Sequence, residues 1–307
     1  MKKMMAEWAV TLALSSLTVA AACAAEMPVK ARPPAAPPVP TWTGLYIGVN
    51  GGGVWGTTYP NFTIDDSQGN YFTFGAGQTA NVVAVQGAGN SSFNNSGYIV
   101  GGHIGYNNQI DYAVFGVEAD FDAFRPKGSS SFVGALPATA TGLCTGGACT
   151  AFTFNNSSSA NWLATLRGRF GVAVYNGLLY GTAGLAVTHM SFSSAFFNAT
   201  TSPPQVSGGL TENFSDSRVL FGAALGGGAE WAFVPGWSLG VEYLFVGFNG
   251  FRPDAQTTIA VPTNGALGGT CPPSSGGHFC SVFHYGYAMN ESIVRARLTY
   301  RIGNIWH

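Results

Sequence analysis

The chain has 307 residues, of which only 9% are charged and 13% are aromatic, and its formal net charge is −1. A soluble surface normally carries roughly a quarter or more charged residues, so water alone is a poor match for this composition. The balanced charge argues against a nucleic-acid partner, because no basic surface remains to neutralise phosphates.

Residues 1–25 have the three parts of a secretory signal peptide. Two lysines near the start precede an apolar segment and a stretch of small residues, for which we predict cleavage after Ala25. Cys23 keeps open the alternative of a lipoprotein cut just before this cysteine. Residues 26–40 contain six prolines and predict a stiff, extended periplasmic linker.

From residue 41 onward, eight segments alternate apolar and polar residues with the period of a β-strand. Their approximate ranges are 43–55, 97–107, 112–124, 160–173, 178–189, 217–232, 237–248 and 291–302. Three short turns alternate with four long connections, at about 56–96, 125–159, 190–216 and 249–290. Outer-membrane barrels place short turns in the periplasm and long loops outside the cell. We therefore predict that residues 41–307 form one all-β domain, an eight-stranded antiparallel transmembrane β-barrel with four long extracellular loops.

One face of these segments carries acids and arginines, and the opposite face is apolar. In the last segment, three arginines alternate with valine, alanine, leucine, tyrosine and isoleucine. If the apolar faces meet lipid, the charges line a narrow lumen, where acids and arginines must nearly match because an unpaired buried charge is costly. The predicted lumen charge network comprises Glu118, Asp120, Asp122, Arg167, Arg169, Arg218, Glu230, Glu242, Arg295, Arg297 and Arg301.

Aromatic residues near the ends of the segments predict the two girdles that mark membrane interfaces. The girdle on the turn side would contain Trp42, Tyr106, Tyr112, Trp231, Trp237 and Trp306. The girdle on the loop side would contain Trp55, Tyr98, Phe121 and Trp162. As a set, these aromatics favour a membrane protein over a soluble one.

Four cysteines follow the signal segment, in two local pairs within long connections. An exported chain meets oxidising conditions, so we predict the disulfides Cys144–Cys149 and Cys271–Cys280. Zinc is the competing interpretation, but neither pair has the short two-residue gap of a strong zinc site.

Several segments resemble a known family. The run from Thr41 to Gly52 (TWTGLYIGVNGG), together with FGVEAD at 115–120, LRGRFG at 166–171 and VRARLTY at 294–300, resembles the small outer-membrane β-barrels of the OmpA-like and opacity-protein-like immunogenic porin type found in alphaproteobacteria. This resemblance implies the outer membrane of a Gram-negative bacterium, with lipid and lipopolysaccharide as neighbours and insertion by the barrel-assembly machinery. Such barrels usually end on an aromatic residue, whereas this chain ends Trp306-His307.

One short motif raises the question of catalysis. His189-Met190-Ser191 is similar to the His-x-Ser element of lipid A deacylases, in which serine is the nucleophile and histidine the base. The orienting acid of that family is missing, and the nearest downstream acid is Glu212. The remaining histidines are scattered, so we expect no enzyme, no metal site and no cofactor.

Eight strands enclose an interior that side chains can just fill. We therefore expect a structural surface protein, a closed or narrow barrel whose loops serve envelope integrity, adhesion or host interaction and act as a surface antigen. A small-solute porin, a lipid A-modifying enzyme and a soluble β-sandwich adhesin are the alternatives. The loop sequences carry no recognisable partner motif.

Overall fold

The structure is a computed structural model that describes residues 41–65, 79–136, 151–198, 210–251, 256–262 and 278–302. The expectations for the signal segment, the proline linker, Cys23 and the chain end at Trp306-His307 lie outside these residues. Both predicted disulfides lie outside them as well, since only the backbone of Cys280 is described among the four cysteines concerned. Within the described part, no helix is long and apolar enough to cross a membrane.

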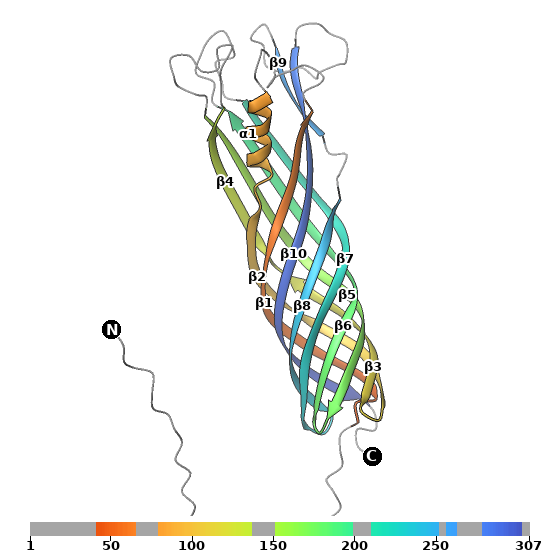
Figure 1. Cartoon of the computed structure of the whole chain (residues 1–307). Helices are drawn as coiled ribbons and strands as arrows, with labels where there is room; N and C mark the ends of the chain where they lie inside the picture. The colour runs from red at the N-terminus through yellow and green to blue at the C-terminus, as the bar shows by residue number, and fades with distance from the viewer. Residues whose placement is uncertain are drawn as a thin grey trace, which may run out of the picture. The chain divides into compact units, whose positions relative to one another are not determined.

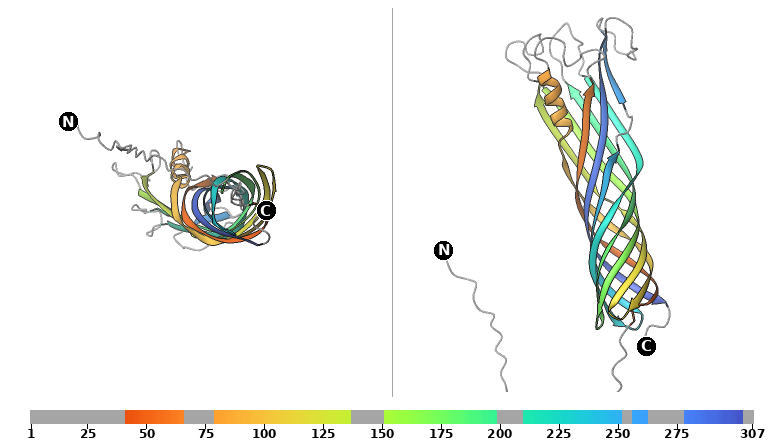
Figure 2. Two further views of the ribbon diagram at one scale, coloured as in Figure 1. Left: turned by 90° about the horizontal axis from the view of Figure 1, so that it is seen from below. Right: turned by 45° about the vertical axis from the view of Figure 1, so that its right-hand side comes forward.

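A closed ring of eight antiparallel strands forms the barrel (Figures 1 and 2). The elements are β1 (Gly44–Asp65), α1 (Thr79–Gly89), β2 (Phe93–Ile110), β3 (Ala113–Phe124), β4 (Lys127–Ala135), β5 (Ala151–Val174), β6 (Gly177–Asn198), β7 (Leu210–Val234), β8 (Trp237–Phe251), β9 (Gln256–Pro262) and β10 (His278–Ile302). The ring runs β1-β10-β8-β7-β6-β5-β3-β2 and closes where β2 pairs with β1. Strands β4 and β9 lie off this ring and pair with β5 and β10. The predicted fold is confirmed, and the open β-sandwich is ruled out.

Tight two-residue turns join three pairs of strands at one end of the barrel, the lower end in Figure 1. The turn residues are Asp111-Tyr112, Tyr175-Asn176 and Pro235-Gly236. Each turn contains a residue with positive φ: 53° at Asp111, 51° at Tyr175 and 82° at Gly236. Gly177 follows the second turn as the first residue of β6.

The turn-side part of every ring strand presents an apolar outer face. Its exposed large side chains include Leu45, Ile47, Val49, Ile104, Phe115, Val117, Leu166, Phe170, Leu179, Leu185, Leu225, Leu239, Val241 and Val294. Aromatic residues border this band, with Tyr106, Trp231 and Trp237 exposed near the turns and Trp55, Tyr98 and Phe121 exposed at its other margin. This arrangement is that of a lipid-facing band between two interfaces.

Several strands extend far beyond their predicted loop-side ends. Strand β1 runs to residue 65 instead of 55, β6 to 198 instead of 189, and β10 begins at 278 instead of 291. The 22 residues of β1 span about 73 Å at about 3.3 Å per residue, whereas a transmembrane strand needs only about 9–11 residues. Much of the sequence predicted as long loops therefore forms a sheet above the lipid-facing band, called here the extracellular extension.

The helix α1 compensates for a missing strand partner in this extension. Strand β2 begins at Phe93, so the part of β1 beyond Thr58 has no β2 neighbour. The Asn90 side chain, just after α1, accepts a hydrogen bond from the Phe62 N–H (2.6 Å) and donates one to the Phe62 carbonyl (2.8 Å). One amide side chain thus satisfies both main-chain groups of Phe62 at this edge, which would otherwise be open for pairing with another chain.

Candidate functional site

The interior of the lipid-facing band contains a compact layer of charged side chains, the charge layer. It comprises nine of the eleven residues predicted for the lumen, namely Glu118, Asp120, Asp122, Arg167, Arg169, Glu230, Glu242, Arg295 and Arg297. These residues come from β3, β5, β7, β8 and β10, and each is at most 4% exposed. They point inward because the strand period puts them opposite the apolar residues that face lipid.

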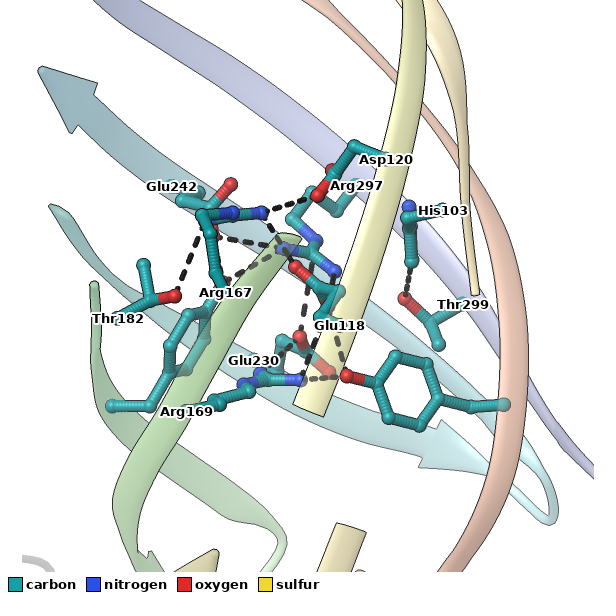
Figure 3. Close-up of polar contacts among 12 residues, drawn as sticks. His103, Glu118, Asp120, Arg167, Arg169, Thr182, Glu230, Glu242, Arg297 and Thr299 are labelled. Atoms are coloured by element: carbon teal, nitrogen blue, oxygen red, sulfur yellow. Dashed lines mark hydrogen bonds and ion pairs between the residues drawn. The ribbon is translucent and has the colours of Figure 1, made fainter. Parts of the chain in front are cut away.

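Arginines cross-link the strands of this layer (Figure 3). Arg167 binds Glu118 at 2.6 Å, Asp120 at 2.7 Å and Glu242 at 3.1 Å, and so joins β5 to β3 and β8. From β10, Arg297 contacts Glu118 and lies 2.8 Å from Glu242. Glu118 lies on β3, which is not a neighbour of β10 in the ring, so the ion pair between Arg297 and Glu118 spans the lumen.

The two remaining arginines complete the layer toward its two ends. Arg295 lies 2.5 Å from Asp120 and 3.1 Å from Asp122, on the side of the extracellular extension. Arg169 lies 2.5 Å from Glu230, on the turn side. Four guanidinium groups thus face five carboxylates, so the charges nearly cancel as buried charges require.

Hydroxyl groups extend the charge layer to further strands. Tyr46 of β1 donates a hydrogen bond to Glu118 (2.9 Å), and Tyr180 of β6 donates one to Glu242 (3.2 Å). His103 of β2 is hydrogen-bonded to Thr299 of β10 at 2.9 Å. Tyr180 was not predicted as a lumen residue, although its spacing from Thr182 puts both on the inward face. All eight ring strands therefore contribute to one polar interior.

Glycines make room for these large side chains. A Cβ added at Gly105 would lie 2.3 Å from the hydroxyl of Tyr46, and one at Gly101 would lie 2.2 Å from a carboxylate oxygen of Asp122. Both distances are too short for any side chain, so the close approach accounts for glycine on the inward face of β2.

The turn-side mouth is closed by Trp42. Gly44 has a φ of 133°, which a side chain would disfavour, and just before it Trp42 lies within the barrel at 1% exposure. The Arg301 guanidinium lies 4.2 Å from the centre of the Trp42 ring and donates a hydrogen bond to the Thr41 carbonyl. One prediction is corrected here: Trp42 is not a girdle residue. Arg301 is buried on the inward face of β10, at the level of this stopper.

Arg218 is also displaced from its predicted place. Its guanidinium lies 2.5 Å from Asp216, and its side chain is 33% exposed in the extracellular extension. Asp216 also accepts a hydrogen bond from Tyr287 (3.1 Å). Burial raises the pKa of the Tyr287 phenol, and the neighbouring Asp216 carboxylate raises it further. The period-two pattern indicates which face Arg218 occupies but carries no information about its height in the barrel.

Above the charge layer, the interior becomes apolar and aromatic. Phe62 lies 5.0 Å from both Phe154 and Phe283, measured between ring centres, and Tyr285 stacks on Phe214 at 4.2 Å. The buried cluster continues through inward residues of all the surrounding strands, including Val54, Ile99, Phe124, Leu163, Met190, Phe192, Phe196, Leu244, Phe248 and Ile293. This aromatic layer fills the extracellular extension, and many of its residues had been predicted to lie in loops.

A small polar cluster lies within the apolar interior above the charge layer, between the levels of Ile293 and Met289. Asn95 donates hydrogen bonds to Glu291 (2.9 Å) and to the Thr58 hydroxyl (2.7 Å), and it accepts one from Ser158 (3.1 Å). All four side chains are buried. Glu291 was not predicted as a lumen residue, although it shares the inward phase of Arg295 four residues later.

The candidate catalytic pair is on the outside of the barrel. His189 and Ser191 both lie on the outer face of β6, where Ser191 is hydrogen-bonded to Ser217 (2.7 Å) and His189 contacts Asn161 (3.4 Å). Within the described residues, no hydrogen bond joins His189 to Ser191, and no group of three potential metal-ligating side chains occurs. Among the described residues, Ser191 is hydrogen-bonded to a second serine and not to the histidine proposed as its base.

Comparison with known proteins agrees with this architecture. The model of the outer membrane protein β-barrel domain matches residues 10–261. The chain belongs to this family. Two relatives, the 31 kDa outer-membrane immunogenic proteins of Brucella melitensis biotype 1 and Brucella suis biovar 1, are each 31% identical over 216 residues, which is 69% of this chain and 74% of the relative. Membership of the family places the chain in the outer membrane of a Gram-negative bacterium.

Solved structures show weaker likeness. The outer membrane protease OmpT from Escherichia coli has a TM-score of 0.39 at 10% identity and covers 86% of this chain and 98% of its own. The outer membrane protein OprG from Pseudomonas aeruginosa has a TM-score of 0.34 at 9% identity and covers 85% of this chain and 97% of its own.

Proposed function

We propose that this protein is a non-enzymatic surface protein whose closed barrel anchors a rigid extracellular extension in the outer membrane. The supporting observation is the burial of the charged lumen: Arg167, Arg295, Arg297 and Glu118 are each only 1% exposed, although they line the centre of the barrel. A water-filled channel would expose these side chains. The aromatic layer above them and the Trp42 stopper below them close the same path at two further heights.

The exposed end is then the part that meets the surroundings. The extension raises its outer face well beyond the lipid-facing band, as adhesion, envelope integrity or surface recognition would require. The relatives are named immunogenic, which is in keeping with such exposure of this chain. The partners we propose are outer-membrane lipid, lipopolysaccharide and, during biogenesis, the barrel-assembly machinery.

Conductance of the refolded protein in planar lipid bilayers tests the closed barrel against the alternative of a small-solute porin. We expect no stable conductance step from the natural chain at neutral pH. A double variant, Glu118→Ala with Arg297→Ala, removes one pair that spans the lumen and leaves room for water, so it should give small, irregular steps. The matched control, Asp216→Ala with Arg218→Ala, removes an ion pair outside the charge layer and should stay silent. A large, stable conductance from the natural chain would refute the closed barrel.

A further inference from the structure

The outer surface of the extracellular extension has an ordered patch of small polar side chains. Directly paired residues on four adjacent strands form a row of serines, Ser129 of β4, Ser157 of β5, Ser193 of β6 and Ser215 of β7. The rows on either side are Ser131-Asn155-Ala195-Asn213 and Lys127-Ser159-Ser191-Ser217. We call the ten serines and asparagines of these three rows the serine face.

The serine face is hollowed and available to a ligand. A groove of about 510 Å³ lies over it, lined by residues of all four strands, including Ser129, Asn155, Ser193 and Ser215. The members of the face are exposed or half-buried, whereas their chain neighbours Asn156, Ser158 and Ser194 are buried on the inner side of the sheet. The small side chains leave the backbone surface low, and this produces the hollow.

The chemistry of the groove is that of hydroxyl recognition. Serine hydroxyls both donate and accept hydrogen bonds, and asparagine amides do the same through separate atoms. Adjacent hydroxyls already bond to each other, as between Ser157 and Ser193 at 2.8 Å, so they can exchange these bonds for bonds to a ligand hydroxyl. The three rows contain no carboxylate and a single cation, Lys127. A polyhydroxylated, uncharged or anionic molecule fits this surface.

Side chains at two margins of the serine face add an apolar surface and positive charge to its hydroxyl groups. Above it, the exposed Phe197 ring and Val133 lie in the next paired row and offer an apolar surface for the C–H face of a sugar ring. Below it, the exposed side chains of Lys127 and Arg125 lie at the corner nearest the membrane and offer charge to a phosphate group. Hydroxyls flanked by an aromatic ring and two cations are suited to a phosphorylated oligosaccharide.

The height of the face indicates where this sugar comes from. On β6, the outward residues just below Ser191 are His189, Val187 and Leu185, which lead directly into the lipid-facing band. The serine face therefore begins where the lipid tails end, at the level of the outer-leaflet headgroups. We propose that it binds the oligosaccharide of the outer leaflet's glycolipids. This proposal rests on placement in the outer membrane and is independent of whether the lumen is closed.

Binding of defined glycolipids to the refolded full chain tests the proposal. The probes are phosphatidylcholine vesicles containing lipopolysaccharide with its core oligosaccharide, matching vesicles containing lipid A without core sugars, and the free core oligosaccharide. We expect at least about tenfold tighter binding to the vesicles with core sugars than to those with lipid A, and measurable binding of the free oligosaccharide. Equal binding to the two vesicles, or no binding of the free oligosaccharide, would overturn the proposal.

Substitutions locate the binding surface. Ser157→Glu with Ser193→Glu puts bulk and negative charge in the centre of the groove and should weaken binding of the free oligosaccharide at least about tenfold. The matched control, Asn61→Glu with Asn94→Glu, adds the same charge to exposed positions on β1 and β2 and should leave binding unchanged. Equal effects of the two double variants, or an unchanged affinity of the first, would overturn the assignment to the serine face.

Folding of each variant is checked by heat-modifiable gel mobility. If the central variant fails to fold, Ser129→Glu with Ser131→Glu serves instead, because β4 pairs with β2 only at Lys127 and Gly128 and tolerates bulk at its edge. Lys127→Gln should weaken binding less than either double variant and should reduce its dependence on salt. We expect these outer-face changes to leave conductance unaffected, so failure of the glycolipid proposal is distinct from failure of the closed barrel.

Discussion

The lower and upper halves of the same strand in this barrel have opposite polarity. In the lower part of β6, the outward Leu185 is 67% exposed to lipid and the inward Thr182 bonds within a polar interior. In the upper part, the outward Ser193 lies on a polar surface and the inward Phe192 is 2% exposed in the aromatic layer. The medium outside decides which face is apolar: lipid accepts the apolar face below, and water forces it inward above.

The change of polarity coincides with local irregularities. In β5, a bulge lies between Ala160 and Leu163, so that buried positions are even-numbered before it and odd-numbered after it. A bulge inserts one residue and re-aims every side chain beyond it. The lower half therefore behaves as a membrane barrel with a charged core, and the upper half as a water-soluble barrel with an aromatic core.

The largest expected effect comes from breaking the lower core. Arg297→Ala leaves Glu118 and Glu242 buried with one cation fewer, and should lower the free energy of unfolding by about 3–5 kcal/mol. Urea unfolding of the protein in lipid vesicles measures the change. Arg218→Ala removes an arginine of the upper half that is 33% exposed, and should cost less than about 1 kcal/mol. Equal losses of unfolding free energy for the two variants would show that the charge layer stabilises the barrel no more than the exposed Arg218 does.

A second test places the same charge on one outer face at two heights. Leu185→Arg puts a cation against lipid tails and should destabilise the barrel by about 2–4 kcal/mol. Ser193→Arg, eight residues further along β6 on the same face, meets water and should change stability by less than about 0.5 kcal/mol. Vesicle-based unfolding again gives both values. A comparable loss for Ser193→Arg would mean that the lipid band reaches higher than the structure indicates.

The smallest effect concerns the aromatic layer. Phe62→Leu keeps an apolar side chain but loses the edge contacts with Phe154 and Phe283, which should cost about 1 kcal/mol. The exposed neighbour Asn61 provides the control, since Asn61→Ala removes no buried contact. Hydrogen exchange of the upper parts of β1 and β10 should report the loss for Phe62→Leu alone. Unchanged exchange would show that the extension is held by its backbone ladder and not by its core.

The strands of the lower half were readily predicted because apolar and charged residues alternate along them. Leu166 and Phe170 against Arg167 and Arg169 indicate the two faces of β5 without any tertiary information. The upper half was missed because serines and asparagines on the outer face have low strand propensity and resemble loop sequence. The Phe152 and Phe154 pair of β5 then looked like isolated aromatics in a connection, although these residues alternate inward.

The sequence by itself determined the number of ring strands, which residues of each strand face inward or outward, and the presence of matched charges. These properties follow from a local period of two residues. The tertiary structure alone decided the heights. Strand tilt and the stagger of ring closure set which residues on distant strands share a level, and so Arg297 meets Glu118 whereas Arg218 is held at Asp216. The same ring closure places Trp42 in the turn-side mouth of the barrel and aligns four serines from four strands in one row.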